Sequence, residues 1–231
     1  EGVDVIWAAR GGYGAMRTLA KLKTGAPRRK VFVGYSDMCA LQFGVLGADV
    51  NCVHGAMPID CIAGKVTNIE DTYSFVECLT KEGRAAERTH KLLALSLGEA
   101  QGPVFASNLA VLMALVGTPF EPVLPAGSIL CLEDVGEYLY ALDRLFWRLS
   151  QSRIASQLSG LVLGDFTDLE DNPVPWGETV EQVAVRYFSH IPVASGLPIG
   201  HGEKNQPVLQ GETGVFIVSD AGAKISLSGQ L

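Results

Sequence analysis

The sequence lacks the features that mark disulfide-rich, zinc-binding and membrane-spanning proteins. It has five cysteines among 231 residues, an odd number, and no two of them have C-x-x-C spacing. A disulfide framework and a structural zinc site are therefore not expected. No uninterrupted apolar run is long enough to cross a bilayer, and no signal peptide is visible.

Basic residues are also scarce. The chain has 18 Lys and Arg against 25 Asp and Glu, which gives a net charge of −7. Because binding to a phosphate backbone needs a basic face, this balance argues against a nucleic-acid partner.

The cysteines indicate a reducing compartment. Cys39, Cys52 and Cys131 lie in apolar runs, where a free cysteine behaves as a small buried hydrophobic residue. Structural disulfides are rare in the cytoplasm, so we expect a cytoplasmic protein. The chain begins at Glu1 without an initiator methionine, and we expect its natural start to lie upstream.

What the sequence does contain is enough apolar material for a large core, 48% of its residues. The first part alternates strands with helices. Strand–helix–strand spacing of this kind predicts parallel βαβ units, whose sites lie at the carboxyl ends of the strands. The expected strands are residues 3–9, 31–33 and 50–55, and the expected helices are 15–23 and one starting at 37.

The second part predicts a mixed arrangement. Helices are expected at 68–79, 109–116, 140–149 and 179–189, and strands at 91–97, 128–132 and 158–165. The last segments, at 207–209, 215–218 and 225–227, indicate antiparallel strands joined by glycine turns.

These patterns predict an α/β protein of two domains. A parallel α/β domain is expected in residues 1–75, a linker in 76–101, and a mixed α/β, β-rich domain in 102–231. A site between the two would lie in a favoured position for a ligand pocket.

Ser36 is the first candidate for chemistry. It follows an apolar strand and precedes a predicted helix, and Gly34 stands two residues before it. A strand that turns sharply into a helix exposes the serine hydroxyl, as in the nucleophile elbow of hydrolases. The second glycine of that motif is missing, because Met38 holds its place. The alternative is that Ser36 only caps the helix, with Asp37 in its first turn.

A glycine-rich turn, Arg10-Gly11-Gly12-Tyr13-Gly14, follows the first expected strand. Such a turn presents backbone N–H groups to an anion or to an oxyanion. It is not a P-loop, because the Lys-Ser/Thr pair is missing. The alternative is that the glycines simply permit a tight turn between strand and helix.

Possible partners for a serine nucleophile come later in the chain. Glu133 and Asp134 end an apolar run, and a carboxylate in that place must be solvated, paired or used in function. His201 lies between two glycines; it is either a general base or a loop histidine without a role. We interpret His54, at the end of an expected strand, as a structural histidine.

Together, and in this order, the motifs resemble the serine peptidase family that includes muropeptide LD-carboxypeptidase and the microcin C immunity peptidases. The likeness covers almost the whole chain. The matching segments are Arg10-Gly11-Gly12-Tyr13-Gly14, Gly34-Tyr35-Ser36-Asp37, His54-Gly55, Asn108-Leu109, Leu132-Glu133-Asp134-Val135-Gly136-Glu137, Asp143-Arg144 and Gly200-His201-Gly202.

The resemblance implies a role for each member of a catalytic triad. Ser36 would be the nucleophile, and His201 the general base and later the acid. Glu133 would orient His201 and stabilise its imidazolium.

The resemblance also implies a set of binding residues. The backbone N–H groups of Gly12, or its neighbour Gly11, and of Asp37 would form the oxyanion hole. Arg10 and Tyr13 are candidate substrate-binding residues. Arg10 would either hold a substrate carboxylate or pair with an acid nearby.

Family members use no metal or other cofactor, are usually cytoplasmic and are often homodimers. The resemblance therefore implies a serine carboxypeptidase that removes the terminal D-alanine from a murein tetrapeptide by hydrolysing an L–D bond. No nucleic acid or membrane partner is expected. Family chains carry several dozen residues before the glycine-rich turn, where this chain has residues 1–9. We thus expect the first strands of the amino-terminal domain to be missing.

Two other functions remain open, and a third is disfavoured by the residue at position 36. The protein could be an enzyme of the same family that hydrolyses a microcin-like peptidyl nucleotide, with Trp176 stacking on the base. A lone tryptophan in a loop, however, more often has a packing role in the fold. The chain could also be a non-catalytic murein-peptide binder or an inactive fragment. A class I amidotransferase-like enzyme would need a cysteine where Ser36 stands.

Overall fold

The parallel strands predicted in the first part of the chain build a small sheet. The computed structural model describes residues 3–22, 30–45, 50–64 and 66–230. In it β1 pairs in parallel with β2, and β2 with β3. The elements of this part are β1 (Val5–Trp7), α1 (Ala15–Leu19), β2 (Lys30–Gly34), the 3-10 helix η1 (Ser36–Met38), α2 (Cys39–Val45), β3 (Val50–His54) and α3 (Pro58–Ile62).

A short strand from the far end of the sequence completes this sheet. β9 (Val208–Leu209) pairs antiparallel with β3, so the strand order is β1-β2-β3-β9. The carboxyl-terminal part of the chain is therefore hydrogen-bonded directly into the amino-terminal sheet.

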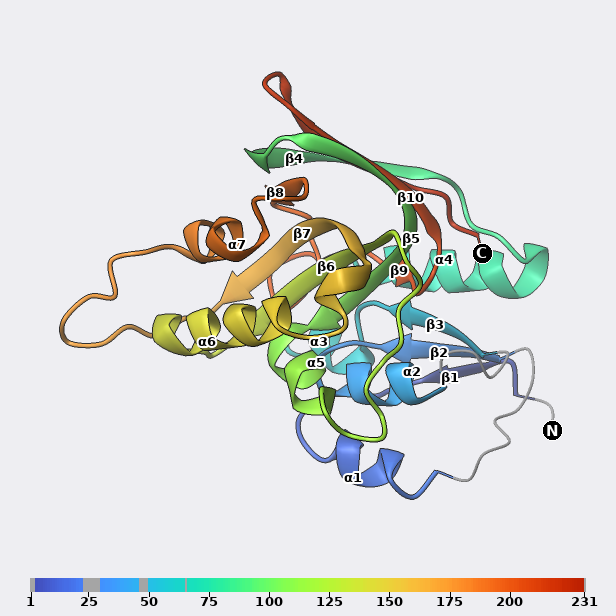
Figure 1. The fold of residues 1–231 in the computed structure, drawn as a ribbon. Coiled ribbons are helices and arrows are strands. Elements are labelled where there is room, and N and C mark those ends of the chain that lie inside the picture. Colours follow the sequence, from blue (N-terminus) through green and yellow to red (C-terminus); the bar gives the residue numbers. More distant parts are fainter. Residues whose placement is uncertain (1–2, 23–29, 46–49, 65, 231) are drawn as a thin grey trace.

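The remaining strands close into a barrel, in the order β10-β11-β4-β8-β7-β6-β5. The run β5-β6-β7-β8 is parallel, and the pairings of β10, β11 and β4 are antiparallel. The antiparallel part forms the long ribbon at the top of Figure 1. The barrel strands are β4 (Arg88–Ser96), β5 (Gly98–Asn108), β6 (Ser128–Val135), β7 (Leu158–Thr167), β8 (Val193–Ser195), β10 (Thr213–Ser219) and β11 (Gly222–Leu227).

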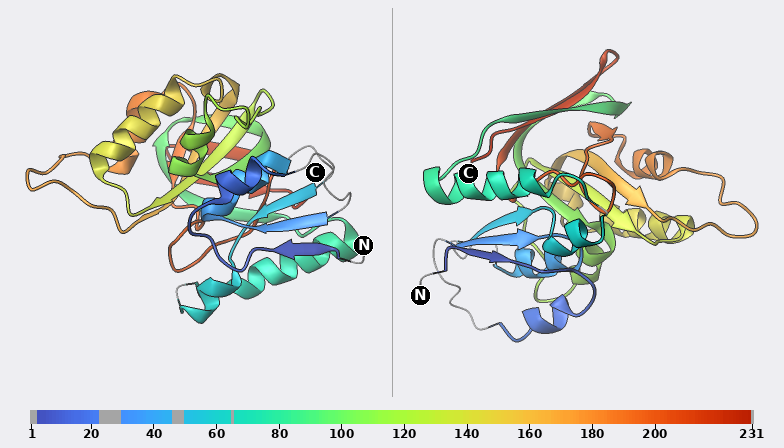
Figure 2. Two further views of the ribbon diagram at one scale, coloured as in Figure 1. Left: turned by 90° about the horizontal axis from the view of Figure 1, so that it is seen from below. Right: turned by 180° about the vertical axis from the view of Figure 1, so that it is seen from behind.

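Helices cover the parallel half of the barrel and one face of the small sheet. α5 (Leu109–Leu115), α6 (Leu139–Ser150) and α7 (Val180–Phe188) share one buried apolar cluster with residues of β6 and β7. α4 (Ile69–Glu82) packs Phe75, Val76 and Leu79 against β2 and β3, and Figure 2 shows it between that sheet and the antiparallel ribbon. A further short helix, η2, spans Ala155–Gln157.

Residues of the barrel strands form one buried apolar cluster, and Phe216 is a fully buried member of it. A Cβ atom at residue 160 would lie 2.8 Å from a ring carbon of Phe216. Gly160 is therefore the residue that lets β7 pass this ring, because the interior is packed without spare volume.

Most predicted elements are present, but one expected helix is shorter and the expected linker contains regular structure. The expected helix 15–23 ends at Leu19, and its last expected residue, Lys23, lies outside the described residues. The range 76–101, expected as a linker, holds the end of α4, all of β4 and the start of β5. The division at residues 75 and 102 stays a prediction. No helix in the described part of the chain is both long enough and apolar enough to cross a membrane.

Candidate active site

Ser36 stands at the point where β2 ends and η1 begins. Its φ angle is +61°, and it shares a positive φ with only one other described residue that is not glycine, Asp168. Left-handed backbone is unfavourable for a residue with a side chain, and such strain gathers at functional sites. The sharp turn leaves the Ser36 side chain partly exposed at the carboxyl end of the sheet.

Three side chains that are far apart in the sequence meet at this turn. His201 Nε2 lies 3.1 Å from Ser36 Oγ, and His201 Nδ1 lies 2.7 Å from Glu133 Oε2. Glu133 belongs to β6, one residue beyond the strand predicted there, and its side chain is fully buried. The structure thus brings together the serine, the histidine and the glutamate that the sequence singled out.

Two glycines allow the loop that carries His201 to come this close. Gly200 has a φ angle of +115°, and a Cβ atom there would lie 2.7 Å from Glu133 Cβ. A Cβ atom at Gly202 would lie 2.2 Å from Asp165 Oδ2. The Gly-His-Gly sequence is therefore explained by close approach on both sides of the imidazole.

The surroundings of His201 favour its protonated form. Burial lowers the pKa of His201, but the hydrogen bond and the negative charge of Glu133 outweigh burial and raise that pKa above its ordinary value. An imidazole with a raised pKa is a stronger base toward a neighbouring hydroxyl.

The next residue in the chain, Asp134, serves the fold. Burial raises its pKa to about 6. Its carboxylate accepts hydrogen bonds from Asn108 Nδ2 at 2.8 Å and from the backbone N–H of Ala110 at 2.9 Å. Asn108 in turn caps α5 by accepting the N–H of Val111 at 3.0 Å. This pair fixes the start of α5 beside β6.

The glycine-rich turn lies directly against Ser36. A Cβ atom at Gly11 would be 3.1 Å from Ser36 Cβ and 3.2 Å from Ser36 Oγ. The Asp37 carboxylate accepts the N–H of Ala15 at 2.9 Å, so it ties the first residue of α1 to the elbow. Gly12 adopts a φ angle of +124°. The use of the Gly11, Gly12 and Asp37 N–H groups as an oxyanion hole stays a prediction.

The two candidate substrate-binding residues are exposed. Tyr13 is 85% exposed, and the guanidinium of Arg17 lies 5.1 Å from its ring centroid. Arg10 Nε donates to the carbonyl of Gly11. Neither Tyr13 nor Arg10 is hydrogen-bonded to a residue of the triad, and their role in binding stays a prediction.

His54, interpreted from sequence as structural, is fully buried under the site. Neither of its ring nitrogens has a hydrogen-bond partner among the described residues. Burial lowers its pKa to about 3, with a smaller contribution from the charge of His201. His54 is therefore uncharged at neutral pH and is not the histidine that reaches Ser36.

A buried network of two glutamines, which no sequence motif indicates, lies beneath the site. Gln42 Nε2 donates to the carbonyls of Gly34 and Val53, at 2.9 and 2.8 Å. Gln42 Oε1 accepts from Gln210 Nε2 at 2.9 Å, and Gln210 exchanges two further bonds with the backbone of Ala106. The two amides thus join the sheet beneath Ser36 to strand β5. Nothing in a single sequence pairs glutamines so far apart.

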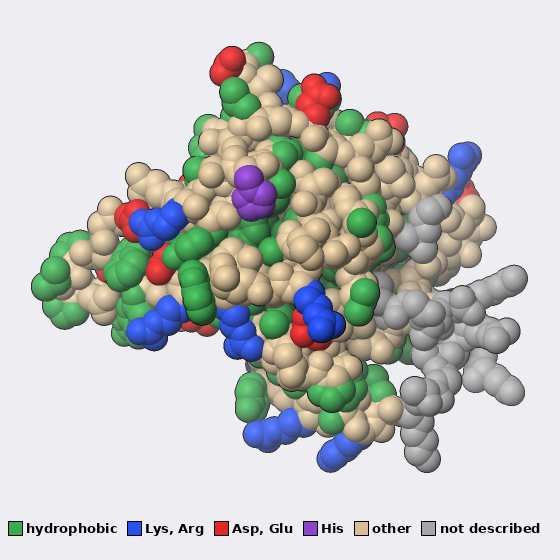
Figure 3. Space-filling model, viewed as in Figure 1, with side chains coloured by type: hydrophobic (Ala, Val, Ile, Leu, Met, Phe, Trp, Pro, Cys, Tyr) green, Lys and Arg blue, Asp and Glu red, His purple; other side chains and the backbone are tan. Residues whose placement is uncertain are grey.

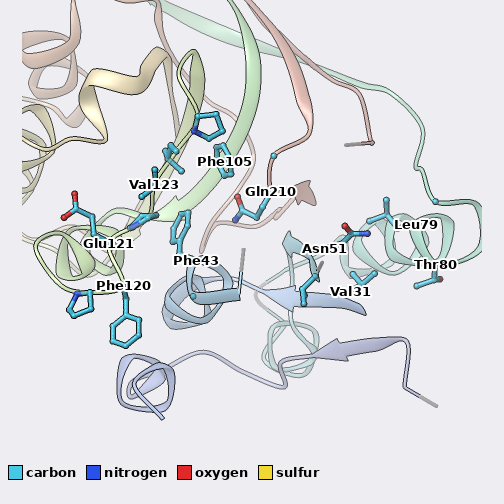
Figure 4. Close-up of a pocket in the computed structure, with 18 of the residues that line it drawn as sticks. Val31, Phe43, Asn51, Leu79, Thr80, Phe105, Phe120, Glu121, Val123 and Gln210 are labelled. Atoms are coloured by element: carbon cyan, nitrogen blue, oxygen red, sulfur yellow. The ribbon is translucent and has the colours of Figure 1, made fainter. Parts of the chain in front are cut away.

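A large cavity lies away from these residues. Its volume is about 1310 Å³, and its lining includes Val31, Phe43, Asn51, Phe120 and Gln210, as Figure 4 shows. Val31 and Asn51 stand near the amino-terminal ends of β2 and β3, whereas Ser36 follows the carboxyl end of β2. None of the three triad residues lines this cavity.

The strain at Ser36 gives a prediction for stability. Alanine disfavours left-handed backbone by about 1–2 kcal/mol, and glycine loses up to about 1 kcal/mol more chain entropy on folding. We therefore expect Ser36→Gly to be more stable than Ser36→Ala by about 0.5–1 kcal/mol in urea unfolding. Asp168→Gly and Asp168→Ala allow the same comparison at a second residue outside the site, because φ at Asp168 is +50°. An alanine variant as stable as the glycine variant at residue 36 would contradict the strain.

The fold and site define a two-domain α/β protein in which a serine, a histidine and a glutamate are arranged as in serine hydrolases. Residues 1–55 match the N-terminal domain of LD-carboxypeptidases, and residues 101–215 match their C-terminal domain. The murein tetrapeptide carboxypeptidase of Pseudomonas aeruginosa is 30% identical over 224 residues, which are 93% of this chain and 72% of that protein. The chain belongs to the LD-carboxypeptidase family.

Solved structures show the same fold. The muramoyltetrapeptide carboxypeptidase from Oxalobacter formigenes superposes with a TM-score of 0.83 at 25% identity, over 99% of this chain and 80% of that one. The microcin C7 self-immunity protein MccF of Escherichia coli is 24% identical over 58% of this chain and 47% of its own length. Its complex with glutamyl sulfamoyl guanosine has a TM-score of 0.79 at 22% identity, covering 98% of this chain and 76% of that one.

Proposed function

We propose that this protein is a serine-type LD-carboxypeptidase that releases the terminal D-alanine of a murein tetrapeptide through an acyl-enzyme. The observation that carries the proposal is the continuous chain of contacts from Ser36 Oγ through His201 to the buried Glu133 carboxylate. The proposed substrate is inferred from the similarity to the murein tetrapeptide carboxypeptidase of Pseudomonas aeruginosa, which this chain resembles over most of its length. A cytoplasmic location and a homodimer belong to the same proposal, on family resemblance.

In the acylation step Ser36 Oγ attacks the carbonyl carbon of the L–D bond. His201 Nε2 takes the hydroxyl proton as the new C–O bond forms, and Glu133 stabilises the resulting imidazolium. The oxyanion of the tetrahedral intermediate is directed toward the N–H groups of Asp37 and of Gly11 or Gly12. The imidazolium then protonates the leaving nitrogen, and D-alanine departs.

Deacylation repeats these steps with water. His201 removes a proton from the water that attacks the Ser36 ester, and the tetrahedral intermediate collapses with return of the proton to Ser36 Oγ. The tripeptide leaves with a free carboxylate. Two lobes supply the groups, because Ser36 follows β2 of the small sheet whereas Glu133 lies in β6 of the barrel.

Product analysis tests the proposed reaction. We expect the protein to release free D-alanine from a murein tetrapeptide and to leave a tripeptide, measured by chromatography and mass spectrometry. The matched control is the same peptide ending in L-alanine, which is expected to remain intact. Equal hydrolysis of both peptides, or of neither, would contradict the assignment.

A second candidate is hydrolysis of a peptidyl nucleotide. The likeness to MccF favours it, and Trp176 is 37% exposed, so its ring has a free surface for stacking. Its loop follows the carboxyl end of β7 and projects beyond α6 and α7 in Figure 1. In the space-filling view of Figure 3 this projection ends in hydrophobic side chains. A higher kcat/KM for a peptidyl sulfamoyl adenosine than for the tetrapeptide would favour this candidate.

The raised pKa of His201 predicts the pH dependence of the reaction. His201 acts as a base only when neutral, so kcat/KM is expected to fall as the pH drops through its pKa, which lies above the ordinary value of 6.5. Glu133→Gln removes the charge that favours the imidazolium. The acid limb of the profile is therefore expected to move to lower pH in that variant. An acid limb at the same pH in both proteins would show that Glu133 does not act on His201.

A further inference from the structure

We propose that Tyr35 is a positioning residue for the proposed reaction: its ring packs against the His201 imidazole, and Asp60 fixes that ring by accepting a hydrogen bond from its hydroxyl. The inference rests on the proposed function, since it assigns a role in orienting the general base. Tyr35 immediately precedes Ser36 in the chain, so one short segment carries both the nucleophile and the support for its base.

The Tyr35 ring lies against His201. The two ring centroids are 4.9 Å apart, with an angle of 56° between the ring planes. Glu133 holds the imidazole at Nδ1 and Ser36 lies at Nε2, but these two contacts leave the ring free to rock about the line that joins the two nitrogens. The tilted Tyr35 ring packed against the imidazole limits that motion and keeps Nε2 aimed at Ser36 Oγ. Small displacements of reacting groups affect the rate, because a shift of about 1 Å lowers it by up to about 100-fold.

Asp60 holds the tyrosine from the other end. Tyr35 Oη donates to Asp60 Oδ1 at 2.9 Å, and Asp60 Oδ2 accepts the N–H of Met57 at 2.8 Å. Tyr35 is 3% and Asp60 5% exposed. Burial raises the pKa of Tyr35, with the Asp60 charge acting in the same direction, so the hydroxyl stays protonated and continues to donate. Both carboxylate oxygens are used, and the tether is anchored to the start of α3.

His54 also packs against Tyr35. Its ring meets Tyr35 edge-on, with centroids 5.7 Å apart and a 60° angle between planes. Because burial keeps His54 uncharged, this contact stays apolar throughout the working pH range. Tyr35 is thus enclosed by His54 and tied by Asp60, and its ring cannot turn away from His201 without breaking a buried contact.

Tyr187 offers a matched control. Its hydroxyl donates to Asp143 Oδ1, also at 2.9 Å, but it lies on α7 and is not hydrogen-bonded to a residue of the triad. Tyr35→Phe and Tyr187→Phe therefore make the same chemical change, the loss of one tyrosine–aspartate hydrogen bond, in two places. Only the first is expected to affect the reaction.

The test compares kcat and KM for murein tetrapeptide, and the second-order rate of labelling by a fluorophosphonate, which needs no peptide subsites. We expect Tyr35→Phe to lower kcat and the labelling rate by about 10-fold and Tyr35→Leu, which also removes the ring, by about 100-fold. KM is expected to change less than 2-fold, because binding residues are untouched, and Tyr187→Phe is expected to match the wild type in all three. Asp60→Asn weakens the tether from its other end and is expected to resemble Tyr35→Phe, so it serves if Tyr35→Phe does not fold.

The outcomes separate the two proposals. A wild-type protein that neither hydrolyses the tetrapeptide nor reacts with the fluorophosphonate would overturn the proposed function and this inference with it. An active wild type together with folded Tyr35→Phe and Asp60→Asn variants of unchanged kcat and labelling rate would overturn the inference alone. So would an equal loss in Tyr187→Phe, since the effect would then follow general stability.

Discussion

Replacing Ser36 with alanine is expected to lower kcat for D-alanine release by about 10⁴–10⁶-fold. The hydroxyl oxygen forms the acyl bond, and among the described residues no other hydroxyl is hydrogen-bonded to His201. The loss should appear in kcat rather than KM, because substrate binding does not need the hydroxyl. Steady-state kinetics on murein tetrapeptide measure both constants.

The control for this variant is a serine outside the site. Ser219 is exposed on β10 and donates its hydroxyl to the carbonyl of Gly222, so Ser219→Ala makes the same chemical change at a distance. Its kcat is expected to equal that of the wild type. A Ser36→Ala protein that folds normally and keeps more than about a tenth of the wild-type kcat would refute the role of Ser36.

The largest effect on stability is expected at Arg88. Its guanidinium donates to Glu212 at 2.8 and 2.6 Å and also to the carbonyl of Pro207. It lies 4.3 Å from the ring centroid of Phe75 on α4. Glu212 is fully buried, so removal of the Arg88 cation leaves the Glu212 carboxylate buried without its counter-charge. Arg88→Met is expected to lower the free energy of unfolding by about 3–5 kcal/mol, measured by urea denaturation.

Two further variants separate this charge effect from a loss of packing. Arg88→Met combined with Glu212→Gln is expected to recover part of the lost stability, because the buried carboxylate is no longer there to be left unpaired. Lys81→Met breaks the Lys81–Glu77 pair, whose side chains are 69% and 43% exposed, and is expected to unfold like the wild type. Similar destabilisation by Arg88→Met and Lys81→Met would contradict this account of the buried pair.

Parts of the site could be predicted from sequence because they rest on local backbone requirements. The Gly-x-Ser turn marks a strand followed by a helix, and the glycines beside His201 mark close approach. An acid at the end of an apolar run, as at Glu133, indicates a carboxylate that must be paired or used. These signals locate three segments, but their meeting point depends on how the barrel and the small sheet dock.

The strand β5 was not predicted, and the reason is physical. It contains Gly98, Gly102 and Pro103, which are typical of loops. In the structure a Cβ atom at Gly102 would lie 2.1 Å from the carbonyl oxygen of Gly127. The glycine therefore serves a close crossing of two backbones inside a strand. A local pattern cannot distinguish this use from a turn.

Contacts between residues far apart in the sequence could not be predicted either. β9 has two residues, too short for a periodic signal, yet it extends the small sheet. The bond between Gln42 and Gln210 and the tether between Tyr35 and Asp60 join residues with no sequence motif in common. Buried polar groups need partners, but only the tertiary fold determines which residues provide them.

The location of the covalent adduct tests the central claim most directly. After incubation with a fluorophosphonate and proteolysis, mass spectrometry is expected to find the phosphonyl group on Ser36, and His201→Ala is expected to remain unlabelled. A folded wild-type protein without an adduct, or with the adduct on another serine, would contradict the assembly of Ser36, His201 and Glu133 into one catalytic unit.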